Sequence, residues 1–257
     1  MSATHPFWVS VFLDLAGEHW ERGAAFWAQV TGTDLSALRG ESQQFASLLP
    51  PDGDDHVRLQ RRDEGASRVH LDLHVEDPES AATAAEGLGA RVMWREHGYV
   101  VLTSPGGLTF CFVDHPASRR AEPATWADGH RSALDQVCLD VPPSRWEEET
   151  AFWSALTGWE RTGSRMPQFD ALRRPGGQPL RFLLQRLDEE LPDHEVTAHV
   201  DLATSDRAAE TERHEALGAR VLDRHDWWTV LRGPAGTTYC ITDRDPETGM
   251  PPAPTTT

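Results

Sequence analysis

The sequence predicts an α+β protein made of two tandem copies of one domain, each with the order strand, helix, strands, twice over. The tripeptide Ala-Phe-Trp at 25–27 recurs at 151–153, an offset of 126 positions. Farther along the offset becomes 129, as when His-Leu-Asp-Leu at 70–73 recurs as His-Val-Asp-Leu at 199–202. Because each offset is shared by several unlike residue types, the pattern indicates duplication of one domain. A period of this length is too long for a solenoid.

The repeat also sets the expected domain boundaries. The stretch between the copies is rich in alanine, proline and arginine and lacks periodicity, while the C-terminal residues are mostly proline and threonine. Such segments are typical of linkers and disordered ends. We expect a first domain at 1–115, a linker at 116–131, a second domain at 132–246 and a disordered tail at 247–257.

The first half of each copy predicts a strand followed by a helix. Apolar residues at 9, 11 and 13 alternate with the residues between them, as in a half-buried strand. A helix follows over about 18–30 and ends near Gly32. In copy two, Ser144 and Glu147 have the spacing of a capping box at the start of the matching helix.

The second half repeats the pattern with a different helix start. Residues 69, 71, 73 and 75 are apolar, and the residues between them are polar, as in another strand with two unlike faces. Asp77 and Pro78 are typical of an N-cap followed by the first helical position. Short strands are expected at 91–96, 99–103 and 108–113, which completes two βαβββ units per copy.

Composition excludes several function classes. The formal net charge is −17, which disfavours nucleic acid and membrane surfaces as partners and favours a small molecule. All 24 basic residues are arginine, so Schiff-base and P-loop lysines are excluded. The N-terminal residues lack signal-peptide features, and three cysteines are too few for a disulfide framework, so we expect a cytoplasmic location.

The repeated His-x-Asp motif is the main candidate for chemistry. On a strand, His70 and Asp72 lie on one face about 7 Å apart, whereas His74 lies about 13 Å from His70 and cannot share an ion with it. We predict His70 and Asp72, with their counterparts His199 and Asp201, as catalytic acid–base residues. The alternative is a structural histidine hydrogen-bonded inside the sheet. Duplication fits either interpretation.

Three further motifs give the chain a family resemblance. The Ala-Phe-Trp tripeptide precedes a helix-ending glycine; His70 precedes Asp77 by seven positions; and Pro-Gly-Gly at 105–107 precedes Phe-Cys at 110–111, with counterparts of all three in copy two. Together they resemble the vicinal-oxygen-chelate superfamily, which includes glyoxalase, bleomycin-resistance and extradiol-dioxygenase types. The resemblance implies that the two βαβββ units of each copy pair into an open U-shaped barrel around a ligand cleft.

The resemblance also indicates where metal ligands would stand. The four matching positions are Val11, Gln60, His70 and Cys111 in copy one, and Val137, Gln185, His199 and Cys240 in copy two. The first-strand ligand is thus valine and the eighth-strand carboxylate is cysteine in both copies. On these departures we predict no required metal, although Zn²⁺ accepts cysteine. Cys111 and Cys240 are either nucleophiles or small buried apolar residues.

Aromatic residues complete the predicted clefts. Trp94, Trp227 and Trp228 fall on the late strands that line the cleft in this superfamily, and aromatic walls suit a planar or cationic ligand. Tyr99 aligns with Trp228, and Gly98 with Trp227, so the two clefts are expected to differ in shape. The predicted ligand-binding residues are Gln60, Trp94, Cys111, Gln185, Trp227, Trp228 and Cys240.

Two functional hypotheses follow, with a third in reserve. The first is a bleomycin-resistance-like protein that binds a small aromatic or cationic molecule without a required metal. The alternative is a metal-dependent lyase, isomerase or dioxygenase that uses the cleft histidines. The third is a scaffold without a ligand. We expect either a monomer whose copies form an internal pseudo-dimer or a homodimer, and the sequence leaves open whether units exchange between copies.

Overall fold

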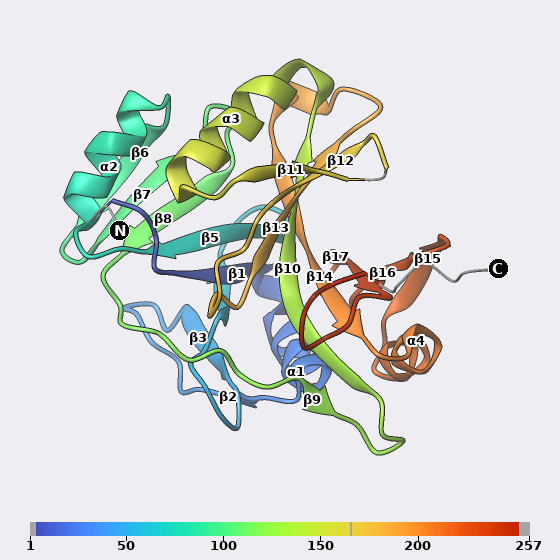
Figure 1. Cartoon of the computed structure of the whole chain (residues 1–257). Helices are drawn as coiled ribbons and strands as arrows, with labels where there is room; N and C mark the ends of the chain where they lie inside the picture. Colours follow the sequence, from blue (N-terminus) through green and yellow to red (C-terminus); the bar gives the residue numbers. More distant parts are fainter. Residues whose placement is uncertain (1–3, 165, 252–257) are drawn as a thin grey trace. The chain divides into compact units, whose positions relative to one another are not determined.

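The computed structural model describes residues 4–164 and 166–251 (Figure 1). Copy one contains two successive βαβββ units, the first with an extra 3₁₀ turn at Gly17–His19. The elements of the first unit are β1 (Trp8–Ala16), α1 (Trp20–Thr31), β2 (Asp34–Leu35), β3 (Phe45–Leu49) and β4 (Val57–Arg62). Those of the second are β5 (Arg68–His74), α2 (Pro78–Gly87), β6 (Arg91–Glu96), β7 (Tyr99–Thr103) and β8 (Thr109–Val113).

Copy two repeats this order after a short strand, β9 (Ala124–Thr125). Short 3₁₀ turns at Pro143–Arg145 and Pro192–His194 precede α3 and β14. The first unit holds β10 (Arg131–Val141), α3 (Trp146–Thr157), β11 (Arg161–Gly163), β12 (Phe169–Leu172) and β13 (Arg181–Arg186). The second holds β14 (Thr197–Thr204), α4 (Arg207–Ala216), β15 (Arg220–Arg224), β16 (Trp228–Arg232) and β17 (Thr238–Thr242).

Each copy forms one open, mixed sheet. The strand order is β2-β3-β4-β1-β5-β8-β7-β6 in copy one and β11-β12-β13-β10-β14-β17-β16-β15 in copy two, with β9 added beside β10. Within the second unit of each copy, β5 pairs in parallel with β8, and β14 with β17. The predicted α+β fold of tandem, paired βαβββ units is confirmed.

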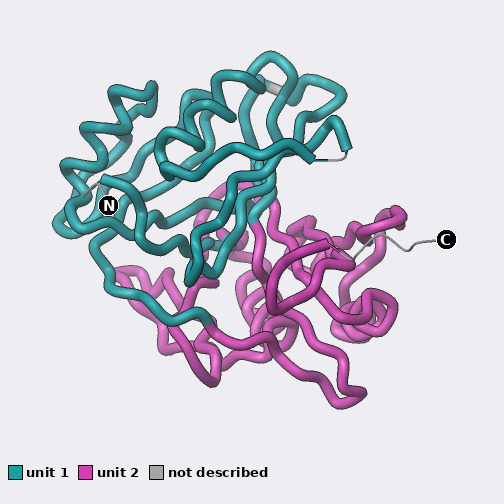
Figure 2. The backbone as a smooth tube through the Cα atoms, viewed as in Figure 1, with its two compact units in different colours: residues 1–13, 68–120, 137–198 teal, residues 14–67, 121–136, 199–257 magenta. Residues whose placement is uncertain are grey.

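The backbone groups into two compact units, called unit 1 and unit 2 below, which are distinct from the βαβββ units and do not coincide with the two copies (Figure 2). Each compact unit joins half of one copy to half of the other. Boundaries between the units fall within strands β1 and β10. Unit 1 comprises residues 1–13, 68–120 and 137–198, and unit 2 comprises residues 14–67, 121–136 and 199–257. The sequence left open whether halves of the copies exchange partners, and the packing inside each unit crosses from one copy to the other.

Aromatic packing and a buried carboxyl hold unit 1 together. On α3 the rings of Phe152 and Trp153 pack against Phe110 of β8 at centroid distances of 5.9 and 5.4 Å. Glu149, also on α3, accepts hydrogen bonds from the indole of Trp153 at 2.7 Å and from the backbone N–H of Gly106. A Cβ on Gly106 would lie 2.8 Å from the Glu149 carboxylate, so glycine is required where this carboxylate enters the turn. Burial raises the pKa of Glu149.

Unit 2 uses a polar network at the matching place. The ring of Tyr239 on β17 packs against Trp27 of α1, with centroids 5.1 Å apart. The Tyr239 hydroxyl shares a hydrogen bond of 2.9 Å with His214 Nδ1. Glu210 is fully buried and receives hydrogen bonds from Arg213 at 2.7 Å and from His130 at 2.8 Å. The residues of copy one that align with Glu210, His214 and Tyr239 are Ala81, Ala85 and Phe110. At this matching place unit 1 therefore packs through aromatic rings and one buried carboxyl, whereas unit 2 packs through a hydrogen-bonded polar network.

The network predicts a pH-dependent stability centred on His130. Burial lowers the pKa of His130, but its hydrogen bonds to Glu210 and Asp128 outweigh burial and raise it overall. A histidine whose pKa is higher in the folded state than in the unfolded state stabilises the fold. This stabilisation is fully present below the unfolded-state pKa of about 6.5 and disappears as pH rises through the folded-state pKa. We expect the unfolding free energy of the native chain to fall between pH 6 and 8.

The test is chemical unfolding across this pH range for the native chain and for His130→Gln. The variant keeps a hydrogen-bonding side chain but cannot titrate, so its slope should be flatter. Arg213 and His214 also face Glu210 and remain in both proteins. Identical slopes in the two proteins would show that His130 does not supply the effect.

Local predictions hold at some element ends and fail at others. Asp77 caps α2 by accepting hydrogen bonds from the backbone N–H groups of residues 79 and 80, and Gly32 ends α1 in the left-handed conformation. The capping box at Ser144 is wrong, because α3 begins at Trp146 after a 3₁₀ turn and Ser144 instead donates to Glu190 at 2.9 Å. The half-buried strand is also wrong, since both faces of β1 are buried.

Two remaining features concern the chain ends and membranes. Residues 247–251 of the predicted tail are described, and the Thr248 N–H donates to the Asp245 carboxylate at 2.8 Å. Residues 252–257 lie outside the described part of the chain. Within the described residues, no helix is both long enough and apolar enough to span a bilayer.

Candidate metal and ligand sites

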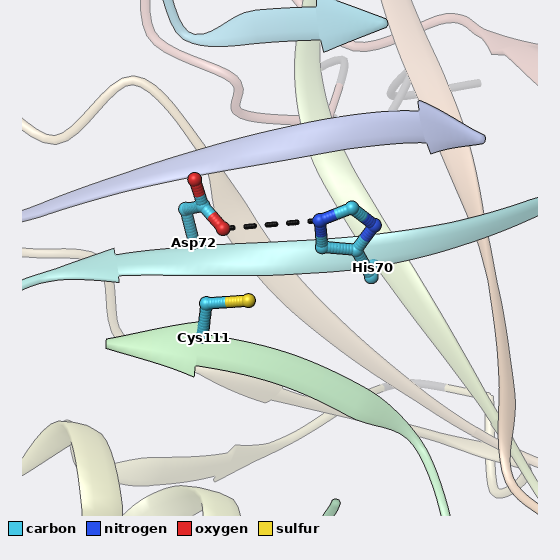
Figure 3. A group of neighbouring side chains, drawn as sticks. All are labelled: His70, Asp72 and Cys111. Atoms are coloured by element: carbon cyan, nitrogen blue, oxygen red, sulfur yellow. Dashed lines mark ion pairs between the residues drawn. The ribbon is translucent and has the colours of Figure 1, made fainter. Parts of the chain in front are cut away.

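Three predicted residues of copy one converge on one face of unit 1. His70 and Asp72 come from β5 and Cys111 from the adjacent strand β8 (Figure 3). Asp72 and Cys111 are direct partners in the parallel ladder, so their side chains leave the sheet on the same side. One donor atom from each residue lies within 4.8 Å of the others, and His70 Nε2 is 3.8 Å from Asp72 Oδ1.

Packing fixes this cluster in place. All three side chains are buried. The ring of Phe12 stacks flat on His70, with centroids 4.6 Å apart and an interplanar angle of 9°. His74, the second histidine of the strand, is occupied elsewhere: its ring nitrogens bond to Ser10 Oγ and to the His115 carbonyl, each at 2.8 Å. The cluster therefore has one histidine, one carboxyl and one thiol.

Unit 2 contains the equivalent cluster of His199, Asp201 and Cys240. Asp201 and Cys240 are partners in the β14–β17 ladder, and one donor atom of each residue again lies within 4.8 Å of the other two. His199 Nε2 is 3.4 Å from Asp201 Oδ1. The structure thus brings together the predicted histidine, aspartate and cysteine of each copy, in separate units.

Asp201 has a carboxylate with two unlike oxygens. Oδ2 accepts a 2.5 Å hydrogen bond from the side-chain amide of Gln136, while Oδ1 is buried and has no hydrogen-bond partner. Burial raises the pKa of Asp201, and the nearby charges of His199 and Arg244 and the Gln136 hydrogen bond oppose this without cancelling it. An orphaned carboxylate oxygen is costly in a protein interior, which suggests that it meets a ligand.

The donor set fits a divalent cation, with a preference among cations. Ligands of a tetrahedral Zn²⁺ with bonds of about 2.0–2.3 Å lie about 3.3–3.8 Å apart, so donor atoms within 4.8 Å of one another need to approach by at most about 1.5 Å. Three protein ligands leave the fourth position open, as in catalytic zinc sites. Cysteine favours Zn²⁺, whereas the two-histidine, one-carboxylate set of non-haem Fe²⁺ oxygenases is one histidine short here.

Aromatic side chains share the face of the unit 1 cluster. Cys111 pairs with Val101 of β7, which pairs with Trp94 of β6. Paired residues point to one side, which places Trp94 on the same face, roughly 10 Å from Cys111 at two strand spacings. Trp94 is 61% exposed. Tyr99, two residues from Val101, lies on this face too, and burial together with Glu96 and Cys111 raises its pKa.

Unit 2 presents a different aromatic at the matching place. Trp228 of β16 lies two residues from Val230, the partner of Cys240, and therefore shares the face of that cluster. Its ring stacks on His225 with centroids 4.4 Å apart. Trp227 is more than half exposed and precedes the strand. The predicted difference between the clefts thus has a physical basis in Tyr99 and Trp228.

The structure describes no contact inside a unit between either predicted glutamine and a cluster. Gln60 belongs to unit 2 and Gln185 to unit 1, so each is in the other unit from the histidine of its own copy. Gln185 accepts a hydrogen bond from the Cys138 thiol at 3.6 Å. Their roles as ligand-binding residues stay predictions.

Sequence reasoning missed Gln136 and Phe12, which contact the clusters directly. The repeat aligns Gln136 with Ser10, and Phe12 with Cys138, so neither residue type is duplicated. A search for repeated residues therefore passes over both. An unlike pair at aligned strand positions beside a repeated motif was the only available signal.

A surface groove of about 580 Å³ lies elsewhere on unit 2, between the ends of α1 and α4. Trp126 and Arg213 form part of its wall, and the Arg213 guanidinium lies 3.5 Å above the Trp126 ring. No predicted site residue lines this groove. The candidate site therefore rests on the convergence of donor atoms.

The family is settled by a match to the model for the glyoxalase-like domain, at residues 10–113 and again at 136–242. The chain belongs to this family. Its two matches cover most of the sequence and fall one in each copy, as expected for tandem glyoxalase-like domains of the vicinal-oxygen-chelate superfamily. No curated protein matches the chain.

Solved structures show the same fold at low identity. A variant of 4-hydroxymandelate synthase from Streptomyces coelicolor is similar with a TM-score of 0.59 and 16% identity, over 93% of each chain. An extradiol ring-cleaving dioxygenase from B. fuscum is similar with a TM-score of 0.60 and 16% identity, over 99% of this chain and 76% of that chain. The halotolerant catechol dioxygenase BphC gives 0.55 and 11%, over 97% and 90%. These similarities establish the fold.

Proposed function

We propose that this glyoxalase-like protein is a metal-dependent enzyme that acts on a small oxygenated aromatic molecule as a lyase or isomerase. His70, Asp72 and Cys111 would hold one Zn²⁺, and His199, Asp201 and Cys240 another. The observation that carries the proposal is the convergence of one nitrogen, one oxygen and one sulfur donor within 4.8 Å in both units. This favours the metal-dependent alternative over metal-free binding.

The residues of the chain divide the work around each centre. A bound Zn²⁺ supplies Lewis-acid polarisation of a substrate oxygen. Burial of the aspartate and cysteine excludes water and lowers the local dielectric, which strengthens electrostatic interactions with a substrate. Tyr99 and Trp94 in unit 1, and Trp228 in unit 2, offer planar surfaces that orient an aromatic substrate.

A dioxygenase is the second candidate, supported by the structural similarity to ring-cleaving dioxygenases. The donor set separates the candidates. Oxygen activation commonly uses Fe²⁺ held by two histidines and a carboxylate, whereas a thiolate with one histidine and one carboxylate favours Zn²⁺. The sequence departures at Val11 and Val137 thus argue for chemistry without oxygen.

The test compares full chain loaded separately with Zn²⁺, Mn²⁺ and Fe²⁺. Each form is assayed for isomerisation of hemithioacetals of aromatic 2-oxoaldehydes and, with an oxygen electrode, for cleavage of catechols. We expect turnover of the first class with Zn²⁺, loss on chelation and recovery on re-addition. Oxygen uptake with Fe²⁺ and a catechol would establish the dioxygenase instead. Turnover equal in chelated and loaded protein would overturn both.

A further inference from the structure

Two aromatic side chains of unit 1 stay open to solvent on the face of the donor cluster. Trp94 of β6 is 61% exposed, and Tyr99 of β7 is 38% exposed. Trp94 is the ladder partner of Val101, and Tyr99 stands two residues before Val101, so the two rings are diagonal neighbours on one face. Within the described part of the chain, neither ring stacks on another aromatic side chain. Grouped exposed aromatic side chains mark ligand or partner contacts, whereas single ones need no explanation.

Two carboxylates flank this aromatic pair. Glu96 is the ladder partner of Tyr99, and burial first and the charge of Glu96 second raise the pKa of the Tyr99 hydroxyl. Asp114 follows β8 and lies against the β6–β7 turn, where a Cβ on Gly98 would lie 3.2 Å from Asp114 Oδ1. Among the residues that the structure describes, neither carboxylate has an ion-pair partner. The name Trp94 patch is used below for Trp94, Glu96, Tyr99 and Asp114.

The arginines of β6 do not neutralise the Trp94 patch. Arg95 alternates with its neighbours along the strand, so it leaves the sheet on the opposite face, where it pairs with two glutamates of α2. Arg91 shares the face of the patch but is the ladder partner of Thr103, at the far end of both strands from the β6–β7 turn. The patch therefore combines two open aromatic rings with two negative charges.

The matching place in unit 2 is occupied by a histidine of the chain itself. His225 aligns with Glu96, and its ring stacks on Trp228 with centroids 4.4 Å apart and an interplanar angle of 23°. His225 Nε2 also lies 3.3 Å from Asp223 Oδ2. Because imidazole becomes a planar cation on protonation, unit 2 places a cation-forming group between an aromatic face and a carboxylate.

The second carboxylate of unit 2 also has a partner from the chain. Asp243, which aligns with Asp114, accepts an ion pair from Arg207 Nε at 3.0 Å. The residue of copy one that aligns with Arg207 is Pro78, the first residue of α2. Unit 2 thus supplies a cationic partner at both places, whereas the aligned residues of unit 1, a glutamate and a proline, cannot.

We infer that the Trp94 patch binds a cationic group of the substrate, a quaternary ammonium or a protonated amine, in the place that His225 takes in unit 2. A cation is attracted both by the faces of aromatic rings and by the two carboxylates. The inference deepens the proposed function and rests on it, since an oxygen of the same molecule would lie at the unit 1 cluster. Across the ladder, Tyr99 and Trp94 lie about 7 and about 10 Å from Cys111, which sets the rough span between the cation and that oxygen.

The experiment compares choline with its neutral isostere 3,3-dimethylbutan-1-ol as probes of the full chain, with NMR detection of the probes' methyl protons. The protein is kept free of metal by a chelator, so the result does not depend on the metal centres. Choline should bind about 3–30-fold more tightly than the alcohol, the range expected for a cation against aromatic faces. Equal affinities, or no binding of choline, would overturn the inference while leaving the metal-dependent function standing. A native chain that takes up no metal would refute that function without changing the choline result.

Variants locate the cation on the patch. Trp94→Leu should weaken choline binding by about 3–30-fold, and the isosteric Glu96→Gln should weaken it by about two- to fivefold, as for a surface charge pair. Trp227→Leu is the matched control, because Trp227 is 52% exposed in unit 2, and choline affinity should stay unchanged. Unchanged affinity in both patch variants, or an equal loss in Trp227→Leu, overturns the assignment. If Trp94→Leu does not fold, Glu96→Gln decides.

Discussion

The chain with both His70→Ala and His199→Ala is expected to remain folded and to lose at least about 99% of its metal-dependent turnover. Each histidine supplies the only nitrogen donor of its three-residue cluster. Removing an outer partner of a metal ligand already costs about 10–100-fold in affinity or activity, so loss of the ligand itself should cost more. Turnover measured at saturating Zn²⁺, with circular dichroism as the check on folding, gives the result.

Single variants and a control assign the effect. His199→Ala alone should remove most activity if the unit 2 centre is the occupied one, and His70→Ala alone should remove less. His97→Ala removes an exposed histidine from the β6–β7 turn and should change neither folding nor turnover. Undiminished activity in the double variant would exclude both histidines from catalysis and restore their structural interpretation.

Glu210→Ala is expected to destabilise the protein by about 3–5 kcal/mol, which is the usual cost of removing one partner of a buried ion pair. Glu210 is fully buried and pairs with Arg213, His130 and His214 at 2.7, 2.8 and 3.1 Å. Its loss leaves two buried histidines and the partly exposed Arg213 beside a cavity. In copy one, the aligned alanine has no such partners around it, so alanine is tolerated there and not here.

The pH dependence of this carboxyl supports the same expectation. Burial raises its pKa, but the hydrogen bonds from Arg213 and His214 prevail and lower it well below its usual range. A depressed carboxyl pKa stabilises the fold above the unfolded value of about 4.3, and this contribution disappears as pH falls toward the folded value. The difference between native chain and Glu210→Ala should therefore narrow in acid.

Urea unfolding at neutral pH provides the measurement, with Glu215→Ala as the matched control on the same helix. Glu215 is half exposed and pairs with Arg224 at 3.8 Å, a surface contact whose loss should cost about 0–1 kcal/mol. Equal destabilisation by the two variants would contradict the network. A Glu210→Ala change below about 1 kcal/mol would do the same.

Much of the fold follows from local patterns and the repeat. The strands at 91–96 and 99–103 were predicted with their observed bounds, because alternating residues are flanked by glycine and turn signals. The capping box at Ser144 failed because its partner, Glu190, lies 46 positions away and outcompetes the local bond. The half-buried first strand failed because coverage of its polar face is a tertiary property.

The candidate site divides in the same way. The i, i+2 spacing of His70 and Asp72 is a strand property, so their proximity could be predicted from sequence. Adding Cys111 required the β5–β8 register, for which only the family resemblance gave a position. Gln136 could not be found, because its contact with Asp201 joins residues 65 positions apart and copy one has serine at the aligned position.

The metal content of untagged protein, determined by elemental mass spectrometry, tests the central claim most directly. The measurement compares the native chain with a Cys111→Ala, Cys240→Ala variant purified in parallel. We expect zinc in the native chain, up to two ions per chain, and little or none in the double variant. A native chain that contains no divalent metal and takes up none from excess Zn²⁺ would contradict it.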